Sequence, residues 1–235
     1  MTDFGPTSIA IGDALAPALP VLDEGVAPMD VSAIPNATLN DDGSITLLLD
    51  YPRTVNFGSV GQAGTQAASY ETLTFRRLTG AQFLKLLRRP RMLEAGMAAS
   101  TGLQEARMAL LLDKMDTSDI FAMRAAFEQI MGGMGDGLPE HAEETPDGIV
   151  LPLRFPVPDG SGDVHHDLVF HRMNGADLKA IEQAKDLVLP TRMARSTGLV
   201  LKVAREVFDA MDAADAYDAN RVARFLSSSG RKTGG

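Results

Sequence analysis

The chain has 235 residues and 45% of them are hydrophobic, which suffices for one large folded domain or two small ones. It contains no cysteine, which excludes disulfides, a thiol nucleophile and cysteine-ligated metal centres. Its net charge of −9 is opposite to the basic excess typical of nucleic-acid binding, and no apolar run is long enough for a membrane helix. We therefore expect a cytoplasmic protein that binds neither nucleic acid nor membrane.

The first 43 residues differ in composition from the rest of the chain. They are rich in Ala, Pro, Gly and Asp, and their apolar residues follow neither a helical nor a strand period. Nearly all of the acidic excess is at this end, because residues 1–52 hold eight acidic groups and no Lys or Arg. We predict that residues 1–43 form a flexible acidic arm.

Residues 44–131 form the first predicted folded unit. Apolar residues alternate in ITLLLDYP (45–52) and in ETLTFRR (71–77), which predicts two strands of a β-hairpin. Thr79 is a suitable N-cap for the helix that follows. Apolar residues then recur at helical spacing before a last helix over about 117–131, so we expect three or four short helices after the hairpin.

Residues 132–148 contain five Gly and two Pro, a composition that predicts a linker. Residues 149–228 then present the same series again, with strands near 149–156 and 166–172, an N-cap at Asn174 and a last helix over about 213–227. Residues 229–235 form a short polar tail.

The two units also share a sequence motif. Eight positions are identical between STGLQEARMALLLDKMDTSD (100–119) and STGLVLKVAREVFDAMDAAD (196–215). From average composition, about one or two identities would be expected by chance. We predict an α+β fold made of two tandem repeats, each a β-hairpin followed by three to four short helices. Gly102 and Gly198 fit the position just past a helix end, where a positive φ is favoured.

The aspartates of the repeated phrase allow two interpretations. Asp113, Asp116 and Asp119, with their counterparts in the second unit, have the ligand type that Ca²⁺ or Mg²⁺ prefers, which would suit a carboxylate-metal enzyme. Their spacing does not match an EF-hand loop, and capping of the following helix is the simpler interpretation. No nucleophile elbow, phosphate-binding loop or dinucleotide motif is present, so we predict no catalytic residue and no cofactor.

Two sets of residues are candidates for binding another protein. One basic cluster comprises Arg76, Arg77, Lys85, Arg88, Arg89 and Arg91. It forms either a solvated helix face or a surface that receives an acidic segment, from the chain's own arm or from a partner helix. The methionines, including Met108 and Met193, occur on helical core stripes, but methionine-rich surfaces also suit adaptable binding of apolar helices.

The order of motifs resembles the tail assembly chaperones of long-tailed bacteriophages, in particular those found with contractile tails. The resemblance is carried by L-x-F-x-R-[LM]-[TN]-G-A after the hairpin, by the turn T-G-L, and by the aspartate that begins the last helix. The matching residues of the first unit are Leu73, Phe75, Arg77, Thr79, Gly80, Thr101, Gly102, Leu103 and Asp119. Those of the second are Leu168, Phe170, Arg172, Asn174, Gly175, Asp177, Leu178, Thr197, Gly198, Leu199 and Asp215.

This resemblance implies a protein that is not an enzyme and that acts in the host cytoplasm. Such a chaperone binds the long helical tape measure protein, keeps it soluble and leaves as the tail tube protein assembles around it. Family members commonly have one unit, whereas two linked units raise the effective concentration of each binding site. The alternative that remains open is a structural component of a phage or phage-like tail or baseplate.

Overall fold

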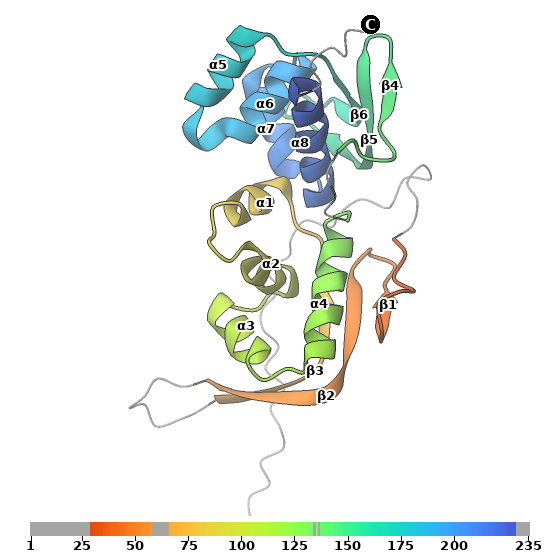
Figure 1. Ribbon diagram of the computed structural model, residues 1–235, viewed down its shortest axis with the longest axis vertical. Coiled ribbons are helices and arrows are strands. Elements are labelled where there is room, and N and C mark those ends of the chain that lie inside the picture. Colours follow the sequence, from red (N-terminus) through yellow and green to blue (C-terminus); the bar gives the residue numbers. More distant parts are fainter. Residues whose placement is uncertain (1–28, 58–65, 134, 136, 229–235) are drawn as a thin grey trace, which may run out of the picture.

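A computed structural model describes residues 29–57, 66–133, 135 and 137–228. These residues form eight α-helices and two three-stranded antiparallel sheets, so the protein has the predicted α+β class. Figure 1 shows two lobes along the long axis, with the elements of the first half in the lower lobe and those of the second half in the upper lobe.

The first half consists of a sheet followed by four helices. Its strands pair in the order β1-β2-β3. The elements are β1 (Ala37–Leu39), β2 (Ile45–Phe57), β3 (Gln66–Phe75), α1 (Gly80–Leu86), α2 (Met92–Thr101), α3 (Glu105–Leu112) and α4 (Thr117–Ile130). The two predicted hairpin strands are therefore β2 and β3, and the hairpin tip between them lies outside the described residues.

The second half has the same order of strands and α-helices, with one added 3-10 turn. Its sheet has the order β4-β5-β6. The elements are β4 (Glu143–Thr145), β5 (Gly148–Pro158), β6 (Val164–Phe170), α5 (Gly175–Gln183), η1 (Lys185–Leu187), α6 (Val188–Thr197), α7 (Leu201–Ala210) and α8 (Ala213–Ser228).

The short strands β1 and β4 correct two predicted boundaries. β1 lies within the predicted arm, and Ile34 just before it is buried in the core, so the ordered part begins before residue 44. The rest of the predicted arm, residues 1–28, lies outside the described residues. β4 likewise belongs to the predicted linker. Each pairs with the long strand that follows it, which provides the hydrogen-bond partners that composition does not reveal.

Helix ends follow the predicted capping chemistry. Thr79 caps α1 and Asn174 caps α5, each with a reciprocal capping box. Gly102 ends α2 at φ 73° and Gly198 ends α6 at φ 77°, both in the left-handed region that favours glycine. The repeated STGL phrase thus encodes a helix end followed by a tight turn.

The long hairpins bend at the same place in both halves. Pairing shifts between Leu48 and Arg53 in β2, and between Pro152 and Val157 in β5. Such an irregularity bends a strand and leaves backbone groups without a ladder partner. A carboxylate from the first turn of α4 or α8 accepts a hydrogen bond at each bend.

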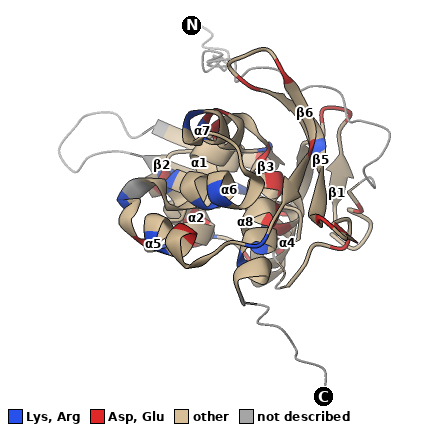
Figure 2. Ribbon diagram, turned by 90° about the horizontal axis from the view of Figure 1, so that it is seen from above, with Lys and Arg blue, Asp and Glu red and all other residues tan. Residues whose placement is uncertain are grey.

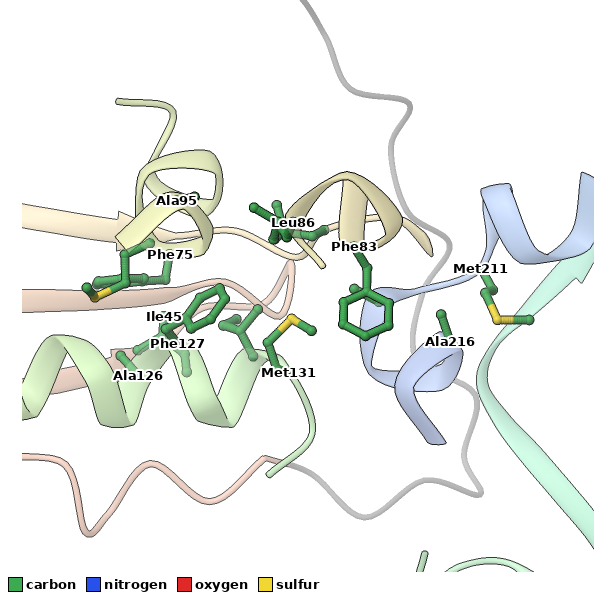
Figure 3. Close-up of a cluster of buried hydrophobic side chains, with 14 of the residues drawn as sticks. Ile45, Phe75, Phe83, Leu86, Ala95, Ala126, Phe127, Met131, Met211 and Ala216 are labelled. Carbon is green, nitrogen blue, oxygen red and sulfur yellow. The ribbon is translucent and has the colours of Figure 1, made fainter. Parts of the chain in front are cut away.

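The two lobes share a continuous hydrophobic core, which α1 joins. Buried residues of both halves belong to one cluster, and α1 packs against α7 and α8 of the other half. In Figure 3, the ring of Phe83 of α1 lies between Met131 of the first half and Ala216 of α8. Among the described residues, no helix is long and apolar enough to cross a membrane.

Candidate functional site

A groove lies between α1, α2 and α3 of the first half. Its lining includes the buried Ala95 and Ala98 of α2, and Leu103 just past the turn. Ala99, which is exposed, also lines it. Small side chains on a helix allow the backbone of a second helix to approach closely, because the interaxial distance depends on the residues at the contact. The groove is therefore suited to an apolar helical partner.

Charged side chains border this groove. Lys85 and Arg89 line it from α1 and its end, and Glu105 lines it from the start of α3. Arg89 pairs with Glu105 at 3.0 Å, and both side chains are about half exposed. An exposed pair of this kind contributes little to stability. Arg89 can therefore release Glu105 and bind a carboxylate on a docked helix at a small cost in free energy.

A second groove occupies the corresponding place in the second half, between α5, α6 and α7. Ala194 and Leu199 line it, as Ala98 and Leu103 line the first groove. Val200 lines it with 72% of its surface exposed, which adds an apolar edge. Asp177 and Arg195 lie 3.8 Å apart at its border. Each half thus presents a groove with small and apolar lining residues and an ion pair at its border.

The structure divides the predicted basic cluster into separate parts. Lys85 and Arg89 are exposed at the first groove, as a partner-binding role requires. Arg76 and Arg88 are exposed elsewhere, and Arg91 precedes α2 and pairs with Glu94 at 3.3 Å. Basic and acidic residues are interspersed over the helices in the view of Figure 2. The cluster is therefore not one continuous basic surface.

Arg77 requires a correction, because it does not face solvent. Its side chain is 3% exposed and pairs with Asp212 at 3.3 Å across the contact between the two halves. The guanidinium also stacks over the ring of Phe155 at 4.5 Å. Arg77 follows Leu73 and Phe75 on the inward face of the strand period, a signal that favoured burial. Its role is to join the halves.

Met108 and Met193 also require a correction. Both are buried in the hydrophobic core, on α3 and α6, so neither contributes to an exposed binding surface. Methionine has an unbranched, flexible side chain that fills irregular spaces in a core. In this chain the helical core stripe is the interpretation of these two residues that the structure supports. The exposed groove residues Ala99 and Val200 were not predicted, although small residues before STGL offered a signal for the first.

A buried ionic network lies beside Arg77 at the contact between the halves. Arg154 of β5 donates to Asp215 at 2.7 Å and to Asp218 at 2.8 Å. Arg221 donates to Asp218 at 2.9 Å, and His141 lies 3.7 Å from the same carboxylate. A buried carboxylate that keeps its charge needs such partners, because the loss of water strongly disfavours the ionised form.

Burial dominates the titration of this network. It raises the pKa of Asp215 to about 7, with a further contribution from the nearby charge of Asp212 and an opposing one from Arg154. Burial also raises the pKa of Asp212, against the opposing charge of Arg77. The pKa of His141 is lowered by burial and by the positive charge of Arg154. Asp215 of this network thus has a pKa near neutral pH.

The aspartates of the repeated phrase lie in capping and structural positions. Asp116 and Asp212 occupy the N-cap region of α4 and α8, and Asp212 accepts a hydrogen bond from Ala214 N–H at 2.8 Å. Asp116 instead pairs with Arg53. In the described part of the chain, no group of three His, Asp or Glu side chains is arranged to hold a metal ion. Asp116 and Asp212 thus each have a partner within the chain.

Comparison of the chain with known protein families, with curated proteins and with solved structures finds no match in any of the three.

Proposed function

We propose that the protein is a phage tail assembly chaperone that holds the helical tape measure protein in its two grooves. The two grooves, one in each half, carry this proposal, because each combines small and apolar side chains with charged ones, and a long helical partner offers repeated apolar surface along its length. The resemblance of the motifs to the chaperone family supplies the identity of that partner. The protein acts in the host cytoplasm and releases the tape measure as the tail tube protein assembles.

We also infer that the two halves are tandem copies of one unit. Shared sequence motifs support this, and so do matching backbone hydrogen bonds at corresponding positions of the two halves. Arg76 N–H donates to Ser100 C=O at 2.9 Å, and His171 N–H donates to Ser196 C=O at 2.6 Å. The first bond ties β3 to the end of α2, and the second ties β6 to the end of α6. Two copies let one chain grip two successive segments of a single partner.

The grooves suit weak and reversible binding. An ion pair with a half-exposed arginine borders each groove. Only some of the lining residues are apolar, so each groove alone offers little apolar area. A tape measure must be released in sequence as the tube grows, which favours many weak contacts over one tight contact. Two linked grooves meet this requirement because binding of one raises the local concentration of the other.

Co-expression with the tape measure protein of the same phage tests the proposal. We expect the full chain to increase the soluble fraction of the tape measure and to co-purify with it. Ala99→Glu and Val200→Glu place a charge in each groove at exposed positions, so they should reduce co-purification without unfolding the chain. Val164→Glu, on an exposed strand position outside both grooves, is the matched control.

Mature tails distinguish the chaperone from a structural tail component. A chaperone leaves during assembly, so mass spectrometry of purified particles should find the chain at far below one copy per tape measure. Stoichiometric recovery in mature tails would establish the structural role instead. A tape measure that stays equally insoluble with and without the chain would reject the chaperone function.

A further inference from the structure

The contact between the halves includes a close approach of two backbones. Ala213 N–H donates to Leu78 C=O at 2.8 Å, and Gly80 N–H donates to Met211 C=O at 2.8 Å. A Cβ at Gly80 would lie 1.9 Å from the carbonyl oxygen of Phe208, so only glycine fits there. The start of α1 is therefore docked on the corner between α7 and α8 (residues 208–217), which we call the α7–α8 corner.

Two side-chain contacts complete this docking. Phe83 of α1 meets Tyr217 of α8 edge to face, with ring centroids 6.0 Å apart. Arg77, just before α1, forms the buried pair with Asp212. The interface within the chain thus combines a backbone bridge, an aromatic contact and an ion pair.

The residues of this interface have counterparts in the other half, and these counterparts form a second pair of surfaces. Arg172, Gly175 and Leu178 around α5 correspond to Arg77, Gly80 and Phe83. Asp116, Ile120 and Phe121 correspond to Asp212, Ala216 and Tyr217, and we call residues 112–121 the α3–α4 corner. Leu178 is 42% exposed and Phe121 is 64% exposed. Both surfaces are therefore open to solvent, whereas their counterparts are buried against each other.

Gly175 is the most informative of these residues. Nothing lies within 4 Å of the position that its Cβ would occupy, and its φ is not in the left-handed region. Within one chain, neither crowding nor backbone geometry requires glycine at this position. Its counterpart Gly80 needs glycine because of a docked backbone. We infer that Gly175 meets the same need when another corner docks on it.

Charge and shape are consistent with such docking. Arg172 is exposed, and no hydrogen bond or ion pair joins it to another described residue. Arg77, the counterpart of Arg172, pairs with Asp212. The counterpart of Asp212 is Asp116. The Asp116 side chain is also largely exposed, and Arg53 binds one of its oxygens. A second guanidinium can bind the remaining oxygen, because a carboxylate accepts several hydrogen bonds.

The apolar side chains of the open pair differ in size from their counterparts, one being smaller and the other larger. Phe83 faces the small side chain of Ala216 in the docked pair, as Figure 3 shows. In the open pair the smaller Leu178 would face the larger Ile120. The combined volume therefore stays similar, and volume-conserving exchanges of apolar residues preserve packing best.

We propose that the chain self-associates head to tail, with α5 of one copy docked on the α3–α4 corner of the next copy, as α1 is docked on the α7–α8 corner within the chain. α5 and the α3–α4 corner lie toward opposite ends of the molecule in Figure 1. One chain therefore cannot join its own two open surfaces without a large rearrangement. A contact between unlike surfaces generates rings or helical filaments rather than a simple two-fold dimer.

The proposal does not depend on the chaperone function, because it concerns the purified chain alone. Failure to self-associate would leave binding of the tape measure untested, and failure to bind the tape measure would leave self-association standing. If both hold, a head-to-tail series of grooves would follow a long helical partner along its length.

The test uses the full chain and two variants that each remove one surface. Leu178→Asp charges the α5 surface, and Phe121→Asp charges the α3–α4 corner, both at exposed positions. Sedimentation velocity over a concentration series should show wild-type species of several times 25.0 kDa. Each variant alone should associate at least about tenfold more weakly, as expected when a central apolar anchor is charged. Val164→Asp, exposed and outside both surfaces, should assemble like the wild type.

Mixing the two variants gives a result that unfolding cannot imitate. Each variant retains the surface that the other has lost, so an equimolar mixture should form a one-to-one dimer and stop there. Gly175→Ala should weaken association while the melting temperature stays unchanged. A wild-type chain that remains monomeric up to about 200 μM would overturn the proposal, since that excludes even weak specific association. Assembly of both variants like the wild type, or a mixture that stays monomeric, would overturn it as well.

Discussion

Asp119 accepts a hydrogen bond at 3.0 Å from the backbone N–H of Asp50, although 69 positions separate them. Asp215 accepts the same bond from Arg154 N–H at 3.0 Å in the second half. Each carboxylate is buried in the first turn of a helix and is directed at the bend of the long strand. The last helix of each half therefore fixes the strand at the point where its ladder is interrupted.

Removing this carboxylate should destabilise the first half. We expect Asp119→Ala to lower the free energy of unfolding by about 1–3 kcal/mol, because the Asp50 N–H loses its partner. Asp119→Asn keeps an acceptor and should cost less. Urea unfolding followed by circular dichroism measures both, with the exposed Asp113→Ala as control. Equal stabilities of Asp119→Ala and the control would contradict the structural role.

The pair of Arg77 and Asp212 gives a second prediction. Arg77→Met should lower the free energy of unfolding by about 3–5 kcal/mol, because it leaves a buried carboxylate without its partner. Adding Asp212→Asn should recover part of this loss, since the remaining buried group is then neutral. Urea titrations of the single and double variants measure the recovery. Arg76→Met, at the exposed neighbour, should change little, and a double variant less stable than Arg77→Met would refute the pairing.

The two corresponding glycines should respond differently to the same substitution. Gly80→Ala forces a methyl group into the carbonyl of Phe208, so we expect a loss of about 1–3 kcal/mol or more from overpacking. Gly175→Ala meets open space and should leave the unfolding of dilute, monomeric protein unchanged. Thermal unfolding at low protein concentration compares them. Similar melting temperatures for both variants would show that α1 is not docked as described.

Asp215 predicts a specific dependence of stability on pH. Its pKa is raised by burial to about 7 in the folded protein, from an ordinary value of 3.8. Between these values the folded state holds a proton that the unfolded state releases, so this group's contribution to stability falls as pH rises toward 7. Asp215→Asn cannot release that proton. Melting temperatures across this pH range should therefore decline less steeply for Asp215→Asn than for the wild type, and parallel curves would contradict the raised pKa.

Local chemistry was sufficient to predict much of each half. Alternating apolar residues gave the strands, Thr79 and Asn174 gave two helix starts, and Gly102 and Gly198 gave two helix ends. These features depend on residues close together in the chain. They are predictable because backbone conformation and capping are decided locally.

The contact between the halves could not be predicted in the same way. Arg77 continues the inward side of the strand period just past the end of β3, but its partner Asp212 is 135 positions away in the other half. The second half has every corresponding residue, yet among the described residues its α5 packs mainly on α6 and η1 of its own half. Sequence periodicity identifies a face that will be buried, and it does not identify what covers that face. The grooves escaped prediction for the same reason, since their walls come from three helices.

Direct binding of the tape measure tests the central claim. Fluorescence anisotropy of labelled helical segments from that protein, titrated with the full chain, reports binding without assembly or solubility effects. We predict saturable binding that Ala99→Glu and Val200→Glu each weaken and that the double variant Ala99→Glu/Val200→Glu abolishes, while Val164→Glu binds like the wild type. Segments that give no anisotropy change with the wild-type chain, or that bind the double variant equally well, would contradict the claim that the grooves hold the tape measure.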